Sequence, residues 1–243
     1  MKMTEKVVDF VRLSPEKKHH FFQDIWRFDQ EIFPAASIDY LYDYLHDIDA
    51  VSIPVVQYFA DGNLVGQNLI RILKLDLDDR PIFVFNSRAG FLPQYRRQNQ
   101  SLHSAIRIAL QYKLKHPHIP FWFAPTIMQP KVYMLFASRT SNFYPRANKQ
   151  IPEQHHRVLK RMLSRKKNVE ERGEGIYVYP CDLPKADPEH LMRLRNNAEV
   201  HVNFFMQHLP DYFDGLGMMC ICELDLKTIL ETTINLTLDR RIS

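Results

Sequence analysis

A polar segment at residues 93–102, Pro-Gln-Tyr-Arg-Arg-Gln-Asn-Gln-Ser-Leu, has the residue types of an anion-binding junction. It follows an apolar run at 82–85 that predicts a strand, and it opens a helical pattern that continues to about residue 115. The first N–H groups of a helix lack intrahelical partners, and the helix dipole leaves partial positive charge there. Arg96 and Arg97 add charge-assisted donors that suit phosphate. The sequence therefore predicts that this strand-to-helix junction binds an anion.

The same segment resembles the cofactor motif of the GNAT superfamily of acyl-CoA N-acyltransferases, written Q/R-x-x-G-x-G/A. Here it reads Arg96-x-x-Asn99-x-Ser101, and Pro93, Tyr95 and Arg97 fit the context in which the family motif often stands. Both glycine positions are replaced, although glycine allows the closest backbone approach to a phosphate. The resemblance implies that this loop binds the coenzyme A pyrophosphate, through Arg96, Arg97, Gln98, Asn99, Gln100 and Ser101.

The resemblance also implies the co-substrate, which would be acetyl-CoA or a longer acyl-CoA. The pantetheine arm would lie along the strand before the motif, at Phe83, Val84, Phe85 and Asn86. A β-bulge at 86–87, or irregular backbone at 88–90, would splay this strand from its neighbour. The acyl-chain length and the identity of the amine acceptor stay open.

A proton donor for the departing thiolate is often, in this family, a tyrosine on the helix after the next strand. Tyr133 is the one tyrosine in the corresponding predicted helix, which makes it the catalytic candidate, and Tyr144 is the reserve. A general base is harder to assign because the predicted strands carry no Asp or Glu, and Asp76, Asp78 and Asp79 fall in a turn. The sequence therefore names a general acid and no base.

The predicted order of elements gives the fold class. Weak alternation at 6–13 predicts a strand, and Ser14-Pro15 is typical of a helix start, followed by helices that end before Pro34 and near residue 48. Strands follow at 51–59, 64–75 and 81–86, then a helix at 98–115, a strand at 121–124 and a helix at 129–138. This β-α-α-β-β-β-α-β-α order matches the superfamily. It predicts an α/β (α+β) fold with a mixed, mainly antiparallel central sheet flanked by helices.

The chain divides by this interpretation into an acyltransferase-like core at 1–150 and a C-terminal extension at 151–243 that packs on the core or completes it. The extension is predicted to hold a basic helix at 152–167, a polar loop at 170–175, a strand at 176–180 and a short helix from Asp187. An apolar strand at 218–224 precedes a final helix and strand at 227–238. The apolar strand either pairs across subunits in a homodimer or stays internal.

Composition limits the class of protein. The 243 residues are 45% hydrophobic and 12% aromatic, which supplies a sizeable core and disfavours disorder. A net charge of +4 permits an anionic cofactor but is too small for a typical nucleic-acid binder. Three cysteines without C-x-x-C spacing disfavour a disulfide scaffold or a zinc site. Without an 18-residue apolar stretch or a signal-peptide core, we expect no membrane span and a cytoplasmic protein.

Three functions agree with these patterns. The first is an acyl-CoA-dependent N-acyltransferase that moves an acyl group from a coenzyme A thioester to an amine, and the retained arginines favour it. The second is a non-catalytic interaction or regulatory protein on the same fold, which the missing glycines favour. The third is a binder of nucleic acid or acidic protein through the basic residues at 157–167, for which an affinity that falls steeply with salt would be diagnostic.

Overall fold

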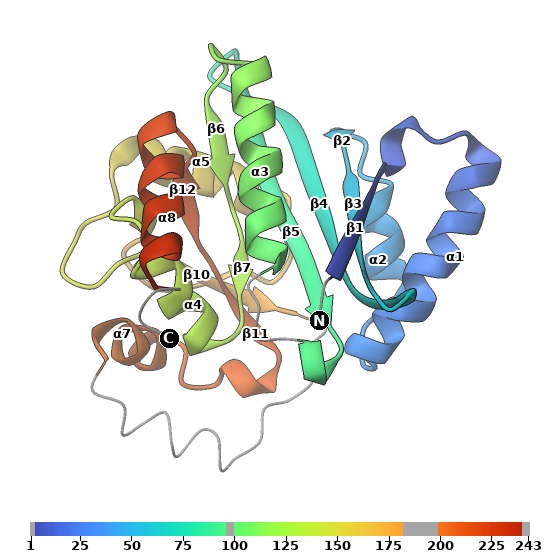
Figure 1. The fold of residues 1–243 in the computed structure, drawn as a ribbon. Helices are drawn as coiled ribbons and strands as arrows, with labels where there is room; N and C mark the ends of the chain where they lie inside the picture. The colour runs from blue at the N-terminus through green and yellow to red at the C-terminus, as the bar shows by residue number, and fades with distance from the viewer. Residues whose placement is uncertain (1–2, 96–99, 182–198, 240–243) are drawn as a thin grey trace.

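The computed structural model describes residues 3–95, 100–181 and 199–239 (Figure 1). Arg96, Arg97, Gln98 and Asn99, and the helix predicted from Asp187, lie outside this part of the chain. The helices are α1 (Pro15–Ile32), α2 (Ile38–Leu45), α3 (Gln100–Lys115), α4 (Pro130–Ala137), α5 (Glu153–Leu163), α7 (Val200–His208) and α8 (Leu226–Asp239), with short 3-10 turns at Phe10–Arg12, Pro93–Tyr95 and Tyr212–Asp214. The strands are β1 (Met3–Asp9), β2 (Ala50–Ser52), β3 (Pro54–Ala60), β4 (Asn63–Leu77), β5 (Arg80–Phe91), β6 (Phe121–Phe123), β7 (Thr126–Ile127), β8 (Phe143–Tyr144), β9 (Glu170–Gly173), β10 (Ile176–Pro180), β11 (Leu216–Met219) and β12 (Ile221–Glu223).

The central sheet has eight strands in the order β1-β3-β4-β5-β6-β12-β8, with β2 paired to β4 beside this path. Within it β5 and β6 run parallel and the other pairs are antiparallel. A second sheet, β7-β11-β10-β9, has four antiparallel strands. The element order and this mixed, mainly antiparallel sheet confirm the predicted fold class. Apart from the short strands β2 and β7, the order from β1 to α4 is the one that the resemblance to the GNAT superfamily implies.

Local signals in the sequence account for the boundaries of several elements. The Ser14 hydroxyl accepts a hydrogen bond from the Lys17 N–H at the start of α1, and Pro15 occupies the first helical position. Asp61 and Gly62 both have positive φ, 49° and 81°, between β3 and β4. Two successive residues with positive φ form the type of two-residue turn that joins antiparallel strands. These elements therefore form as predicted.

Several boundaries differ from the predictions: the strand predicted at 51–59 is divided into β2 and β3, and the helix predicted at 152–167 ends at Leu163. The strand predicted to end at residue 86 continues to Phe91, and its register with β4 is regular from Arg80 to Phe91, so the predicted bulge is absent. The reason is that β4, with 15 residues, is longer than β5 and gives each of these residues a partner. The final segment is helical throughout as α8, without the predicted strand. The predicted polar loop at 170–175 contains β9, which forms a hairpin with β10.

The apolar stretch at 218–224 also differs from its prediction as one strand. It divides at Cys220 into β11, which lies between β7 and β10, and β12, which lies between β6 and β8. Both strands are therefore paired within the chain. Through β12 the C-terminal region supplies an inner strand of the central sheet.

Helices cover both faces of the central sheet (Figure 1). Side chains of α3, α4 and α7 pack with β3 to β6 in the largest buried cluster, which includes Phe83 and Phe85. On the other face, α1 and α2 pack against β3 and β4, and α5 packs against Ile82 and Val84 of β5. Successive side chains of a strand point to opposite faces. Odd-numbered residues of β5 therefore face α3, and even-numbered residues face α2 and α5.

Three arginines of the basic run, two on α5 and one in the turn after it, contact the rest of the chain. Arg157 pairs with Asp78, the Arg161 Nε donates to the Asp76 carbonyl at 3.2 Å, and Arg165 pairs with Asp47 and Asp49. His155 is buried against Trp122, and burial lowers its pKa to about 4. These contacts connect α5 to the turn between β4 and β5 and to the loop after α2.

A candidate acyl-CoA cleft between β5 and β6

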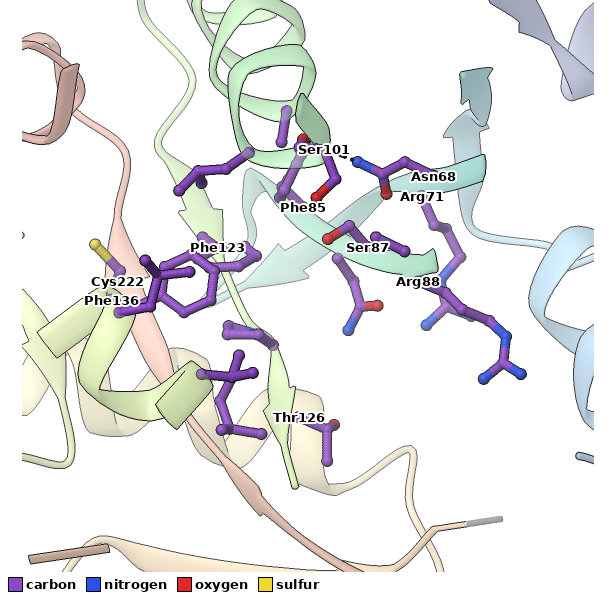
Figure 2. Close-up of a pocket in the computed structure, with 18 of the residues that line it drawn as sticks. Asn68, Arg71, Phe85, Ser87, Arg88, Ser101, Phe123, Thr126, Phe136 and Cys222 are labelled. Carbon is purple, nitrogen blue, oxygen red and sulfur yellow. Dashed lines mark hydrogen bonds between the residues drawn. The ribbon is translucent and has the colours of Figure 1, made fainter. Parts of the chain in front are cut away.

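Strands β5 and β6 pair for three residues and then separate. Phe83, Val84 and Phe85 lie opposite Phe121, Trp122 and Phe123, and the last bond joins the Ala124 N–H to the Phe85 carbonyl at 2.9 Å. Pro125 follows and has no N–H with which to continue the ladder. The chain then enters β7 in the second sheet, whereas β5 stays on β4 to Phe91. Figure 2 shows the strand with Ser87 and Arg88 diverging from the strand that leads from Phe123 to Thr126.

The Asn86 side chain lies at the point of divergence. Its Nδ2 donates to the Ala124 carbonyl at 2.8 Å, so it joins the two strands where their backbone pairing ends. The Tyr44 hydroxyl donates to the Leu69 carbonyl at 3.0 Å and lies 3.2 Å from the Asn86 carbonyl. The vertex of the cleft is therefore fixed by side chains as well as by the ladder.

Beyond this vertex, one edge of β5 has no partner strand among the described residues. The Leu92 N–H donates to Val65 on β4, whereas the Phe83 N–H donates to Pro120 beside β6. Peptide groups alternate in direction along a strand, so the N–H and C=O groups of Ser87 and Ala89 point toward the cleft. This edge can pair with an extended ligand that carries amide groups.

The first turn of α3 is held against β3 and β4 on one side of the cleft. The Asn68 Nδ2 donates to the Ser101 carbonyl at 3.1 Å, as the dashed line in Figure 2 shows. The Ser104 hydroxyl accepts from the buried Tyr58 hydroxyl at 2.8 Å and lies 2.9 Å from Glu5. These bonds fix the end of the helix at which unpaired N–H groups gather. Of the predicted pyrophosphate residues, Gln100 and Ser101 lie here and line the cavity described next.

A cavity of about 500 Å³ occupies the cleft and continues beneath α3, α4 and α8. On the α3 side its wall is mainly apolar and includes Ala105, Val132 and Phe136. On the α2 side it reaches three cationic residues, Arg71, Arg88 and Lys166, the first two of which are labelled in Figure 2. The cavity therefore connects an apolar chamber with a polar one through the gap between β5 and β6.

Only two of the four residues predicted to hold pantetheine line the cavity. Phe85 and Asn86 line the cavity, whereas Phe83 and Val84 are buried in the core on opposite faces of the sheet. The edge of Phe83–Phe85 is already paired with β6. The free peptide groups that could pair with an extended ligand therefore lie two to four residues further along β5. This is the part of the strand that extends beyond its predicted end at residue 86.

Tyr133 does not line the cavity. It is fully buried, its hydroxyl donates to the Pro145 carbonyl at 2.7 Å, and its ring packs against Phe204 and Phe205. Burial also raises the pKa of this hydroxyl well above its ordinary value. Its neighbour on α4, Phe136, faces the cavity instead. The reserve residue Tyr144 packs with His155, on the α5 side of the sheet.

No Asp, Glu or His belongs to the cavity wall in the part of the chain that the structure describes. Of the predicted turn carboxylates, Asp78 pairs with Arg157 on α5, whereas Asp76 contacts α5 through its backbone carbonyl, which accepts from Arg161. Among the groups that do line the cavity, burial raises the pKa of the Tyr44 hydroxyl and of the Cys222 thiol. Both hold their protons at neutral pH, so neither can act there as a general base.

Sequence reasoning missed the cationic residues of the cavity. Arg71 interrupts an apolar strand, Leu69-Ile-Arg-Ile-Leu73, and a charge in such a run is a signal that could have identified it. Lys166 is one of the basic residues at 157–167, whose predicted role was in binding nucleic acid or acidic protein and not in an acyl-CoA cleft. The structure brings both to one wall of the cavity, although they are far apart in the chain.

The structure limits two further classes of function. None of the helices in the described ranges combines the length and the apolar character needed to cross a membrane. Among the same residues, no three His, Cys, Asp or Glu side chains gather as metal ligands would. The three cysteines are free thiols, two of them buried.

Several of the solved structures with a similar arrangement are described as N-acyltransferases or N-acetyltransferases. One from Enterococcus faecalis, described as a probable N-acyltransferase, is 14% identical with a TM-score of 0.35, over 58% of this chain and 32% of its own. Arabidopsis thaliana NAA60, in complex with a bisubstrate analogue, is 14% identical with a TM-score of 0.38, over 61% of this chain and 90% of its own. An aminoglycoside N-acetyltransferase in complex with CoA is 16% identical with a TM-score of 0.31, over 51% of this chain and 76% of its own. No protein-family model and no curated protein matches the chain.

The free edge of β5 leads to a direct prediction. Replacing Ala89 by Pro removes the N–H that points into the cleft without removing a bond to β4. We expect this variant to bind acetyl-CoA about fivefold more weakly in calorimetric titration, since one hydrogen bond contributes roughly 1 kcal/mol. Ala89→Val keeps the N–H and is expected to bind as the parent does. Equal affinity for the Pro and Val variants would show that this edge does not hold the ligand.

Proposed function

We propose that the protein is an acyl-CoA-dependent N-acyltransferase that moves an acyl group from a coenzyme A thioester to an amine. The observation that carries the proposal is the divergence of β5 and β6, which leaves an unpaired strand edge along a cavity beside the start of α3. Pantetheine contains two amides in an extended chain, and such a chain can pair with the edge at Ser87 and Ala89. The pyrophosphate would then meet the first turn of α3 and the segment that contains Arg96 and Arg97.

In the proposed reaction, the nitrogen of the neutral amine attacks the thioester carbonyl, the C–S bond breaks, and the proton that the nitrogen loses is passed to the departing thiolate. The thioester would lie near Asn86, where the two chambers of the cavity meet. The amine would enter from the α2 side, so that the two substrates approach from opposite faces of the sheet. This positions the reacting groups, and we assign no general base among the described residues.

A titration with acetyl-CoA and with a longer acyl-CoA tests the proposal. We expect saturable micromolar binding of at least one of them, and a loss of roughly tenfold or more in Arg96→Ala/Arg97→Ala, because charge-assisted bonds to phosphate are lost. The matched control is Arg12→Ala/Arg27→Ala, which removes the same charge from residues whose side chains are 76% and 78% exposed. The absence of binding by the folded parent protein would refute the proposal.

A second function has its own support. The cavity wall lacks a general base among the described residues, and both glycines of the family motif are replaced. A regulatory protein that binds acyl-CoA without turning it over would have these features. Saturable binding without release of coenzyme A thiol, across a broad set of amines, would favour this alternative.

A further inference from the structure

The chamber on the α2 side of the cavity is lined by three cationic side chains. Arg71, Arg88 and Lys166 line it, and no carboxylate does so among the described residues. Arg71 stacks on Tyr44 at 4.2 Å, Arg88 stacks on Phe33 at 4.2 Å, and the Lys166 Nζ lies 5.0 Å from the centre of the Tyr179 ring. The aromatic rings hold the charged groups in fixed places at the wall.

The carboxylates that pair with these residues do not neutralise all of the positive charge at this wall. Arg88 is paired with Asp29, whereas Arg71 and Arg165 share Asp47, and Arg165 also pairs with Asp49. Lys166 makes no ion pair with any of the described carboxylates. Four cationic side chains thus face three carboxylates, which leaves one positive charge in excess beside the cavity.

Two of these groups have capacity for a further partner. Arg71 is 8% exposed, and its Nε has no hydrogen-bond partner in the described part of the chain. An unpaired donor in a buried position is unfavourable unless a ligand or water completes it. Burial, together with the nearby Arg71 and Arg165 charges, lowers the pKa of Lys166. A bound anion could accept a hydrogen bond from Arg71 and would favour the charged form of Lys166.

We infer that the acceptor is an amine that also carries a negatively charged group, a carboxylate or a phosphate, and that Lys166 and Arg71 bind this group. The inference rests on the proposed function for the meaning of "acceptor", but the anion site exists independently of turnover. It also predicts poor use of polycationic amines, because their additional charges would meet Arg71, Arg88 and Lys166 with no carboxylate on the wall.

Matched pairs of amines test the acceptor class by release of coenzyme A thiol from acetyl-CoA. The pairs are β-alanine with β-alaninamide, and phosphoethanolamine with ethanolamine, which differ chiefly in the anionic group. We expect kcat/KM to be about tenfold or more higher for the anionic member of at least one pair, and the pair that shows it identifies carboxylate or phosphate. We expect Lys166→Gln to lose that preference mainly through KM. Lys167→Gln, at an exposed neighbouring lysine, should keep it.

A labelling experiment decides the anion site without turnover. Acetylation of Lys166 by an N-hydroxysuccinimide ester is followed by peptide mass spectrometry in the presence of N-acetyl-β-alanine, N-acetyl-β-alaninamide or inorganic phosphate. We expect the carboxylate, the phosphate or both to slow the labelling of Lys166 and to leave that of Lys167 unchanged. The amide should change the labelling of neither lysine. Equal rates with all three compounds would overturn the inference. If acetyl-CoA does not bind, the proposed function fails while this result still stands.

Discussion

Ala105→Trp is expected to abolish binding of acyl-CoA. Ala105 lies on the face of α3 that lines the apolar chamber, and it is 8% exposed. An indole at this position enters the cavity of about 500 Å³, so it occupies the proposed ligand space with less overpacking than an insertion into a filled core would cause. We expect affinity to fall by roughly a hundredfold or more, about 2.7 kcal/mol, in calorimetric titration.

The control for this variant is Leu114→Trp. Leu114 lies on the same helix and is 62% exposed, so the substitution adds the same ring outside the cavity. We expect it to leave the affinity unchanged, and thermal unfolding of both variants will show whether they stay folded. Undiminished acyl-CoA binding by folded Ala105→Trp would place the ligand elsewhere.

The second large effect concerns the stability of the wall between α1 and β5. Arg88 makes a bidentate pair with Asp29 at 3.0 and 2.7 Å, and the Asp29 side chain is 2% exposed. Arg88→Ala leaves this carboxylate buried without its cation. Removing one partner of such a pair typically costs about 3–5 kcal/mol. We expect a loss of that order in the free energy of unfolding, measured by urea denaturation.

Two companion variants separate this effect from a general loss of charge. The double variant Arg88→Ala/Asp29→Ala removes both charges, and we expect it to be more stable than Arg88→Ala alone. Asp24→Ala breaks the exposed pair of Asp24 with Arg27, at 3.8 Å, and should cost less than about 1 kcal/mol. A loss in Arg88→Ala as small as that in Asp24→Ala would mean that Asp29 finds another partner or a proton.

Much of the fold could be predicted because its signals are local. Ser14-Pro15 marks the start of α1, and the Asp61-Gly62 turn joins two strands of alternating pattern. The continuation of β5 through Arg88-Ala-Gly90 could not be predicted from those residues, whose β propensity is low. It depends on hydrogen bonding to the partner strand β4, a tertiary interaction that outweighs the low β propensity of these residues.

The site was less predictable because tertiary packing, and not local sequence, decides which side chains line it. The sequence placed Tyr133 on the correct helix, but the packing of α7 against α4 decides which face of that helix is buried, and it buries Tyr133. Arg71 and Lys166 meet only because α5 docks beside β4 and α2. The division of the 218–224 run at Cys220 has no counterpart in its sequence, which is apolar on both sides of that residue.

Two crossings of the chain between the sheets lie side by side. The segment from β6 to β7 passes from the central sheet to the second sheet at Ala124–Pro125, and the segment from β11 to β12 returns at Cys220, whose N–H donates to the Pro125 carbonyl at 2.9 Å. The opening between β5 and β6 is thus braced by two strands joined at their crossing point. A ligand enters a preorganised slot, and little of its binding free energy is offset by ordering the protein. The protein should therefore discriminate between ligands by their shape, because a braced slot does not widen to accept a larger ligand.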